Sequence, residues 1–213
     1  MAQCRITEIF YSLQGETRTV GLPTVFVRLT GCPLRCTYCD TAYAFHGGEK
    51  QDISDIVDQV YHYHPRYITV TGGEPLAQPT CHDLLSDLCD GGAEVSLETS
   101  GAMDITNVDP RVVIVMDLKT PASGEESKNR YDNIDRLKSQ DQLKFVICDR
   151  NDYDWACNKL AEYDLANRCE VLFSPIHGQL KPADLADWIV KDNLPVRMQI
   201  QIHKYLWGDE QGR

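Results

Sequence analysis

Three cysteines lie within ten residues of this chain, in the stretch GCPLRCTYCD at positions 31–40. Cys32, Cys36 and Cys39 form a cluster, whereas the remaining cysteines are scattered along the sequence. A disulfide would leave one of the three unpaired and would need an oxidising compartment, which no other feature of the sequence indicates. Unliganded, three adjacent thiols would be readily oxidised. The spacing therefore predicts a metal centre.

Two kinds of metal centre fit this spacing. A structural zinc site needs four ligands, and His46 is the candidate for the fourth because the sequence holds no second pair of cysteines. An iron–sulfur cluster held by three thiolates leaves one iron open to a substrate or cofactor, which is useful only to an enzyme. The residues alone thus indicate either a zinc-binding interaction module or an iron–sulfur enzyme.

Further motifs follow strand-like segments. Apolar, β-branched runs at residues 24–30, 67–71, 94–98 and 112–116 are followed by the cysteine loop, GGEP (72–75), TSG (99–101) and DLK (117–119), respectively. Ligands bind at the carboxyl ends of strands in α/β folds, so we expect these motifs to converge. Two glycines after a strand let the backbone approach a ligand closely, and Glu74 offers a carboxylate to an ammonium group.

The elements that must position these motifs alternate along the chain. Strand-like runs continue at residues 143–148, 169–173 and 197–202, and helices are predicted at 53–63, 79–90, 152–164 and 183–193. Asp52 or Ser54 suits the start of the first helix, and Pro182 suits the start of the last. Continuously apolar runs are typical of strands in a buried parallel sheet. We predict an α/β fold in a single domain, residues 1–213, with a parallel sheet that is open or curled towards a barrel and a long polar loop at 117–140.

Composition excludes several functional classes. With 42% hydrophobic and 25% charged residues, the chain is predicted to be globular. The net charge of −11 argues against a nucleic-acid partner, because phosphate backbones attract basic surfaces. No segment has the apolar length of a membrane span, and the N-terminal residues do not form a signal peptide pattern. We therefore expect no membrane association and a cytoplasmic location.

The cysteine spacing resembles the signature of radical S-adenosylmethionine enzymes. Tyr38 matches the aromatic residue that this superfamily places before the last cysteine, and GGEP matches the element that meets the amino-acid end of S-adenosylmethionine. The resemblance implies a partial parallel β/α barrel of about six strands. It also implies a 4Fe-4S cluster bound by Cys32, Cys36 and Cys39, which are thereby the catalytic and iron-ligating residues, and S-adenosylmethionine as the second cofactor.

Other stretches resemble the 7-carboxy-7-deazaguanine synthase family in order along nearly the whole chain. They are IFYSLQGE (9–16), VRL (27–29), CDT (39–41), VTGGEP (70–75), ETSG (98–101) and QIHKYLWG (201–208). Two positions depart from the family pattern: Thr17 replaces the usual second glycine, and Asp117 begins DLK where Ser-Pro-Lys is common. The family converts 6-carboxy-5,6,7,8-tetrahydropterin to 7-carboxy-7-deazaguanine with loss of ammonia, towards queuosine. The resemblance implies a radical carbon–nitrogen lyase, with a 5′-deoxyadenosyl radical that removes hydrogen from substrate carbon 6.

The resemblance also implies residue roles and partners. Arg28 suits the substrate carboxylate, because a guanidinium binds it through two hydrogen bonds. The expected magnesium ligand is Thr41, which the sequence without the resemblance would leave as a loop residue. A flavodoxin-type electron donor and a homodimer are expected. Substrate-binding residues are Leu13, Gln14, Gly15, Glu16, Arg28, Thr71 and Arg213. S-adenosylmethionine-binding residues are Tyr38, Cys39, Asp40, Gly73, Ser100, Asp117, Leu118, Lys119, Ser174 and Pro175.

One alternative enzyme uses the same two cofactors. A glycyl-radical-enzyme activase would act on a protein backbone and would need a surface groove instead of a small-acid site. The SLQGE stretch and Arg28 argue against it. The zinc-binding module formed with His46 remains the non-enzymatic alternative.

Overall fold

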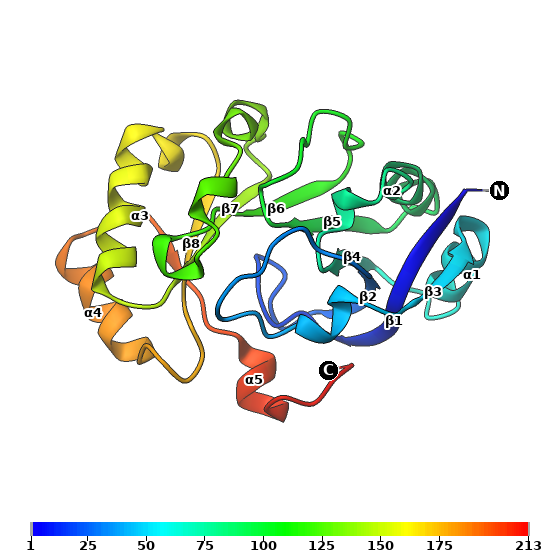
Figure 1. The fold of residues 1–213 in the computed structure, drawn as a ribbon, viewed down its shortest axis with the longest axis horizontal. Coiled ribbons are helices and arrows are strands. Elements are labelled where there is room, and N and C mark those ends of the chain that lie inside the picture. Colours follow the sequence, from blue (N-terminus) through cyan, green and yellow to red (C-terminus); the bar gives the residue numbers. More distant parts are fainter. Residues whose placement is uncertain (1, 213) are drawn as a thin grey trace.

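One open sheet organises the chain, of which the computed structural model describes residues 2–212 (Figure 1). Its strands lie in the order β3-β1-β2-β4-β5-β6-β7-β8-β9. From β2 to β9 the neighbouring strands pair in parallel, whereas β1 pairs antiparallel with β2 and β3. The bounds are β1 Gln3–Leu13, β2 Pro23–Leu29, β3 Glu49–Asp52, β4 Tyr67–Gly72, β5 Glu94–Thr99, β6 Val113–Asp117, β7 Gln142–Ile147, β8 Glu170–Pro175 and β9 Arg197–Met198. Because the sheet curls without closing, it forms a partial barrel.

Helices connect several of the parallel strands and flank the sheet. Figure 1 shows α1 and α2 beside the strands at one end of the sheet, and α3 and α4 beside β7 and β8 at the other. The bounds are α1 Ile53–Tyr61, α2 Cys81–Asp90, α3 Arg150–Glu162, α4 Pro182–Lys191 and α5 Ile202–Trp207. Asp149 caps α3 by accepting a hydrogen bond from the Asp152 amide at 3.0 Å. No described helix has the length and apolar character required to cross a membrane.

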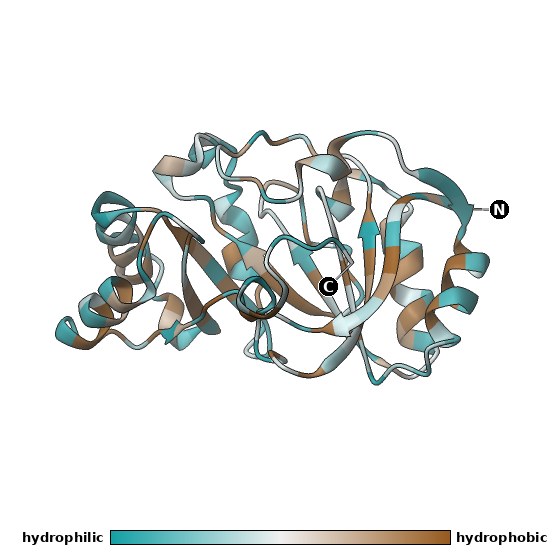
Figure 2. Ribbon diagram, turned by 90° about the horizontal axis from the view of Figure 1, so that it is seen from below, coloured by the Kyte–Doolittle hydropathy of each residue, from teal (hydrophilic) through white to brown (hydrophobic). Residues whose placement is uncertain are grey.

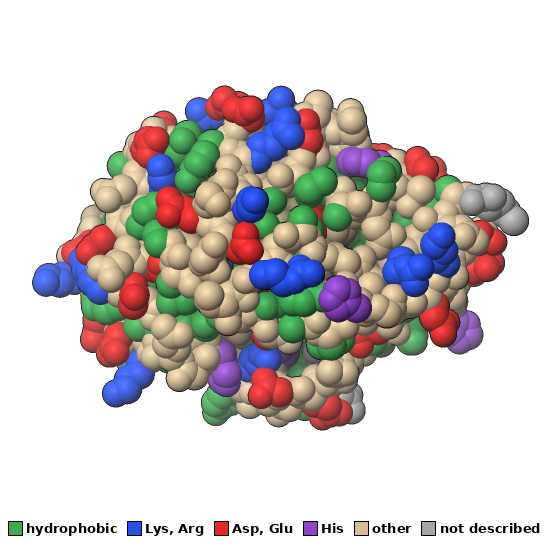
Figure 3. Space-filling model, viewed as in Figure 1, with side chains coloured by type: hydrophobic (Ala, Val, Ile, Leu, Met, Phe, Trp, Pro, Cys, Tyr) green, Lys and Arg blue, Asp and Glu red, His purple; other side chains and the backbone are tan. Residues whose placement is uncertain are grey.

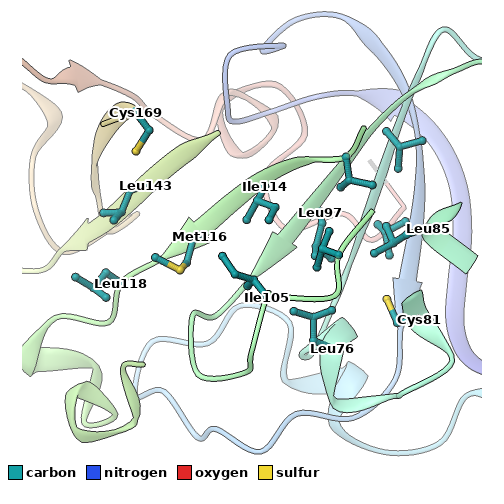
Figure 4. Close-up of a cluster of buried hydrophobic side chains, with 14 of the residues drawn as sticks. Leu76, Cys81, Leu85, Leu97, Ile105, Ile114, Met116, Leu118, Leu143 and Cys169 are labelled. Atoms are coloured by element: carbon teal, nitrogen blue, oxygen red, sulfur yellow. The ribbon is translucent and has the colours of Figure 1, made fainter. Parts of the chain in front are cut away.

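The core lies between the sheet and these helices. Figure 2 shows hydrophobic residues along the central strands and hydrophilic residues on the outward turns of the helices. Leu97, Met116 and Leu143 are fully buried on three successive strands, and Leu85 from α2 is fully buried in the same cluster (Figure 4). Burial of each such side chain stabilises the fold by about 1.5–3 kcal/mol. This packing holds the carboxyl ends of the strands, where the predicted motifs lie, in fixed relative positions.

The predicted strands and helices are confirmed with small shifts at their ends, with one exception. Residues 197–202 form a strand only at Arg197–Met198, and α5 begins at Ile202. The sequence analysis also missed β1 and β3. Asp52 lies at the start of α1, but its side chain accepts no capping hydrogen bond, whereas Pro182 begins α4 as predicted. Residues 117–140 form a loop with three short 3-10 turns: η3 Pro121–Ser123, η4 Glu126–Lys128 and η5 Tyr131–Arg136.

Candidate active site

A cavity of about 250 Å³ opens at the carboxyl ends of the parallel strands. All but two of the predicted site residues line it: Leu13, Gln14, Gly15, Glu16, Arg28, Cys32, Cys36, Tyr38, Cys39, Asp40, Thr41, Thr71, Gly73, Ser100, Asp117, Lys119, Ser174 and Pro175. These residues come from loops far apart in the sequence. The convergence expected from the strand–motif pattern is therefore present.

Two predicted residues do not contribute side chains to this cavity. Leu118 is fully buried in the hydrophobic core, and its amide donates to the Lys144 carbonyl at 2.9 Å. Its neighbours Asp117 and Lys119 point the opposite way, into the cavity, because side chains alternate along an extended chain. Arg213 lies outside the described residues.

The cysteine loop is held from both sides. The Gly31 amide donates to the Ala44 carbonyl at 2.8 Å, and the Thr37 amide and hydroxyl donate to the carbonyls of Ser123 and Ala122 at 3.0 and 2.8 Å. The long loop after β6 therefore braces the cysteine loop from outside. It is anchored by Asp152, a buried carboxylate that accepts from the Ala122 amide at 3.0 Å.

The three cysteines suit a cluster better than a single ion. Among residues 2–212 no three His, Cys, Asp or Glu side chains lie close enough together to hold one metal ion. A four-iron cluster takes each thiolate at a different iron, so its ligands need to face a common volume. Cys32, Cys36 and Cys39 do so, because all three line the cavity, whereas His46 is exposed and does not line it. Burial raises the pKa of the Cys32 and Cys36 thiols, so a bound cation would be needed to stabilise their thiolates.

The GGEP turn packs directly on the cysteine loop. A Cβ on Gly73 would lie 2.2 Å from the Gly31 carbonyl oxygen, so only glycine fits this approach. Glu74 does not face the cavity as expected for an ammonium ligand. Its fully buried carboxylate accepts hydrogen bonds from the Ser100 amide at 2.7 Å and the Thr99 hydroxyl at 3.0 Å. Glu74 therefore fixes the end of β5 against the GGEP turn.

Two buried polar atoms beside the cysteines have no hydrogen-bond partner among residues 2–212. They are the Tyr38 hydroxyl and Oδ1 of Asp117, and both residues line the cavity. The other oxygen of Asp117 accepts from Lys119 Nζ at 2.7 Å. Burial alone would lower the pKa of Lys119, but the Asp117 carboxylate outweighs it and raises that pKa. A ligand with hydrogen-bond donors and acceptors would satisfy both unpaired atoms.

Arg28 projects from β2 into the cavity between aromatic rings. Its guanidinium carbon lies 5.7 Å from the centre of the Phe10 ring and 5.9 Å from that of Tyr43. Nε donates to Glu8 at 2.7 Å, and the Tyr43 hydroxyl donates to the same carboxylate oxygen at 2.7 Å. Glu8 thus orients the guanidinium through Nε and leaves its terminal nitrogens for a ligand.

A charged network forms another wall of the cavity. Glu16 Oε2 lies 2.6 Å from Lys144 Nζ, and Gln14 donates to Glu98 at 3.4 Å. Thr71 donates to the other Glu98 oxygen at 2.8 Å. Burial would raise the pKa of Glu16, but the Lys144 ammonium lowers it to about 2. Burial and the nearby Glu16 charge raise the pKa of Glu98.

Segments from both ends of the chain complete the cavity. Gln201 Nε2 donates to Glu16 Oε1 at 2.7 Å, and His203 from α5 lies against Gly15. A Cβ at Gly15 would lie 2.0 Å from His203 Nδ1, so the glycine makes room for the ring. Burial lowers the pKa of His203, which favours its neutral form.

The lining residues that were missed as site residues include Glu98, Lys144, Gln201 and His203, whose polar side chains face the cavity. Glu98, Gln201 and His203 stand within stretches quoted for the family resemblance, and that was their available signal. Lys144 carried a different signal, because a lysine within an otherwise apolar central strand needs a buried counter-charge.

Thr41 lines the cavity one residue after Asp40. Its hydroxyl donates to Asp40 Oδ1 at 2.8 Å, and Gln201 donates to Asp40 Oδ2 at 3.3 Å. Because the Thr41 hydroxyl uses its proton in this bond, its oxygen lone pairs are free to accept. This geometry is compatible with the expected magnesium ligand.

Comparisons with known proteins agree with this arrangement. The model of the Radical SAM superfamily matches residues 26–115. A 7-carboxy-7-deazaguanine synthase from Chlorobaculum tepidum is 42% identical over 98% of this chain and 96% of its own length. One from Koribacter versatilis is 41% identical over 97% of this chain and 98% of its own length.

A solved structure shares the same fold. QueE from Escherichia coli aligns with a TM-score of 0.77 over 93% of this chain and 94% of that chain, at 22% sequence identity. The sheet, the cysteine cavity and the full-length identity to the curated relatives lead to one assignment. The chain belongs to the 7-carboxy-7-deazaguanine synthase family of the radical SAM superfamily.

Proposed function

We propose that this chain converts 6-carboxy-5,6,7,8-tetrahydropterin to 7-carboxy-7-deazaguanine with release of ammonia, as a carbon–nitrogen lyase on the route to queuosine. One observation carries the proposal. A single cavity is lined by three cysteines suited to an iron–sulfur cluster and by groups suited to an acidic, hydrogen-bonding heterocycle. These groups are a cation, a carboxylate pair and an amide. When bound, the 4Fe-4S cluster and S-adenosylmethionine supply the one-electron chemistry that starts the reaction by hydrogen abstraction.

The chain's own residues bind and orient the substrate. Arg28, already aligned by Glu8, offers its terminal nitrogens to the substrate carboxylate. Glu16 stays ionised beside Lys144 and accepts hydrogen bonds from the ring nitrogens and amino group. Glu98, with its raised pKa, is suited to hold a proton and donate it to a ring acceptor. One edge of the heterocycle thus meets both an acceptor and a donor.

The remaining residues position S-adenosylmethionine and exclude water. Tyr38 and Asp117 present their unpaired polar atoms, and Gly73 allows close approach of the backbone. Ser100, Lys119, Ser174 and Pro175 line the same region. Leu118 would contribute through its backbone. His203 and Gln201 cover the substrate side, which limits access of water to the reacting atoms.

Several finer features belong to this proposal. Thr41 would hold Mg²⁺ together with substrate oxygens and water, as this ion favours few protein ligands. The electron would come from a flavodoxin-type carrier. We also propose a single domain, a homodimer, a cytoplasmic location and a substrate contact by Arg213.

The test is anaerobic turnover of the reconstituted protein with 6-carboxytetrahydropterin, S-adenosylmethionine, Mg²⁺ and a reductant, followed by mass spectrometry. We expect 7-carboxy-7-deazaguanine and ammonia in equal amounts. Reconstituted protein with a substituted cysteine is the matched control. Cleavage of S-adenosylmethionine without this product would contradict the proposal and favour the activase, whereas a colourless protein that retains zinc would favour the interaction module.

A further inference from the structure

A β-bulge in β1 turns Glu8 towards the face of the sheet that bears the cavity. Ile6 pairs with Leu29 and Glu8 pairs with Arg28, so β1 advances two residues while β2 advances one, and Thr7 is the extra residue. Ile6 belongs to the hydrophobic core, and in a regular strand Glu8 would point the same way because side chains alternate. The bulge shifts this alternation by one residue. Glu8 therefore lies beside Arg28 instead of entering the core.

One carboxylate oxygen of Glu8 holds two side chains. Oε1 accepts a hydrogen bond from Arg28 Nε at 2.7 Å and another from the Tyr43 hydroxyl at 2.7 Å. Burial raises the pKa of Tyr43 to about 12 despite the nearby Arg28 cation, so the hydroxyl keeps its proton and donates. The side chains of Arg28 and Glu8 are only 16% and 22% exposed, which limits competition from water. The three groups therefore form one connected arrangement.

Tyr43 stands on a short 3-10 turn, η1 Ala42–Phe45, directly after the cysteine loop. The turn is anchored at Ala44, which is fully buried. The Ala44 amide donates to the Thr41 carbonyl at 2.9 Å, and its carbonyl accepts from the Gly31 amide at 2.8 Å. Gly31 begins the cysteine loop and Thr41 follows it. The Tyr43 hydroxyl is thus fixed relative to the loop that carries the expected cluster ligands.

Neither Glu8 nor Tyr43 lines the cavity, whereas Arg28 does. Glu8 occupies Nε of Arg28, which leaves the two terminal nitrogens for a ligand. We propose that Tyr43 and Glu8 are positioning residues that determine specificity, because they hold the Arg28 guanidinium in the orientation that receives a carboxylate through both terminal nitrogens. The inference rests on the proposed function, since the carboxylate concerned is that of the substrate. Tyr43 acts through Glu8, and Glu8 acts through Arg28.

The gain from this arrangement is an arginine that is ordered before the ligand arrives. A long side chain that is free to rotate loses conformational freedom on binding, and that cost is reduced when Glu8 and Tyr43 already hold it. The molecular surface offers an anion little help. The chain has a net charge of −11, and Figure 3 shows acidic side chains interspersed with basic ones across the face in view. Recognition of a carboxylate therefore depends on the oriented cation inside the cavity.

The test uses two fluorescent ligands, 6-carboxypterin and pterin, which differ only in the carboxylate. Their dissociation constants are measured by fluorescence with the cluster-loaded protein, S-adenosylmethionine and Mg²⁺, without reductant, so no turnover is involved. The ratio of the two constants measures recognition of the carboxylate. We expect Tyr43→Phe to lower the preference for 6-carboxypterin about fivefold or more, while the affinity for pterin stays near wild type.

Tyr11→Phe is the matched control. It removes the same hydroxyl from a tyrosine of β1 that stacks on Tyr63 and does not line the cavity, so the preference should be unchanged. A double-mutant cycle tests whether Tyr43 acts through Glu8. In a Glu8→Ala background, Tyr43→Phe should cause no further loss of preference. Circular dichroism checks that each variant is folded.

An unchanged preference in Tyr43→Phe would overturn the proposal. Equal weakening of both ligands would overturn it too, because a purely structural role predicts that result, and so would additive losses in the cycle. If Glu8→Ala does not fold, the comparison of Tyr43→Phe with Tyr11→Phe decides alone. Variants that behave as expected, in a protein that makes no 7-carboxy-7-deazaguanine, would leave the positioning residues standing and reject the proposed function.

Discussion

Glu16 and Lys144 form a buried ion pair of 2.6 Å although 128 residues separate them in the sequence. Glu16 stands on the loop after β1, and Lys144 projects from β7 near the middle of the parallel sheet. Each side chain is less than one-fifth exposed. The pair therefore ties the N-terminal segment to the far strands and supplies the charges of the cavity wall at the same time.

Removing one partner should be costly. Lys144→Met leaves Glu16 buried without its counter-charge and close to Glu98, so we expect a loss of about 3–5 kcal/mol in the free energy of unfolding. Urea denaturation measures this. Arg66→Ala, which breaks an exposed pair with Glu94, is the control and should change stability by about 0–1 kcal/mol. Equal losses in the two variants would show that the buried pair is no stronger than a surface pair.

The same pair predicts how stability depends on pH. The folded-state pKa of Glu16 is lowered from 4.5 to about 2, so its contribution is complete above the unfolded value and disappears as the pH falls towards about 2. The difference in unfolding free energy between wild type and Glu16→Gln should therefore be largest near neutral pH and shrink below about pH 4.5. Denaturation at several pH values measures it.

Glu98 is the control for that series, because its pKa is shifted in the opposite direction to that of Glu16. Its pKa is raised, so its contribution to stability is present in acid and is lost as the pH rises through the folded pKa. Glu98→Gln removes the repulsion from Glu16 and should not lower stability near neutral pH. A parallel pH profile for Glu16→Gln and Glu98→Gln would contradict both assignments.

Replacing Cys32, Cys36 or Cys39 by Ala should abolish turnover while the protein stays folded. Three thiolates are all the ligands that the chain is expected to give the cluster. Iron content, the visible absorbance of the cluster and circular dichroism separate cluster loss from unfolding. Cys157→Ala is the matched control, because Cys157 lies on α3 away from the cavity and should keep nearly full activity. Full activity in any of the first three variants would remove the radical mechanism.

Arg28→Lys should weaken substrate binding much more than S-adenosylmethionine binding. Lysine keeps the charge but loses the planar group that binds a carboxylate through two nitrogens while a third contacts Glu8. We expect the Michaelis constant for substrate to rise about tenfold or more, equivalent to roughly 1.4 kcal/mol or more. Separate titrations of the two ligands give the comparison, and equal losses for both would show that Arg28 serves the whole cavity.

Thr41→Ala should raise the Michaelis constant for substrate and weaken activation by Mg²⁺. The hydroxyl that donates to Asp40 would be gone, and with it the proposed magnesium ligand. Thr41→Ser keeps the oxygen and should retain most of both properties, with the cluster absorbance unchanged in either variant. Rates measured against Mg²⁺ concentration decide the matter. An alanine variant with wild-type activation would leave Thr41 as a loop residue.

Local patterns predicted the parallel strands and the motif-bearing loops well. A strand that is buried on both faces, such as Val113–Asp117, appears in the sequence as a continuous apolar run. β1 was missed because only Cys4 and Ile6 alternate cleanly in its burial pattern before the strand becomes half exposed. α5 was missed because none of its residues is buried, so no apolar periodicity marks it.

The sequence predicted which residues lie at the site better than it predicted the hydrogen bonds and ion pairs that they make. Glu74 faces the core instead of the cavity because Thr99 and Ser100 donate to it, and no sequence pattern reports which way a carboxylate turns. Lys144 needs Glu16, a partner 128 residues away that spacing does not reveal. The departure at Thr17 has a physical reading: its φ of +63° is the left-handed conformation that glycine adopts without strain. Threonine holds it with local side-chain hydrogen bonds to Thr19.

Gln201 and His203, which cover the substrate side of the cavity, stand on a segment that should open easily. α5 contributes no buried residue, whereas the central strands of the sheet are largely buried, so its free energy of local opening should be far smaller than that of global unfolding. α5 can then detach from the cavity while the sheet remains folded. Amide hydrogen exchange should be fast in Ile202–Trp207 and slow in β4 and β5. Substrate could then enter and product leave through the opening of α5, without loss of the stability of the fold.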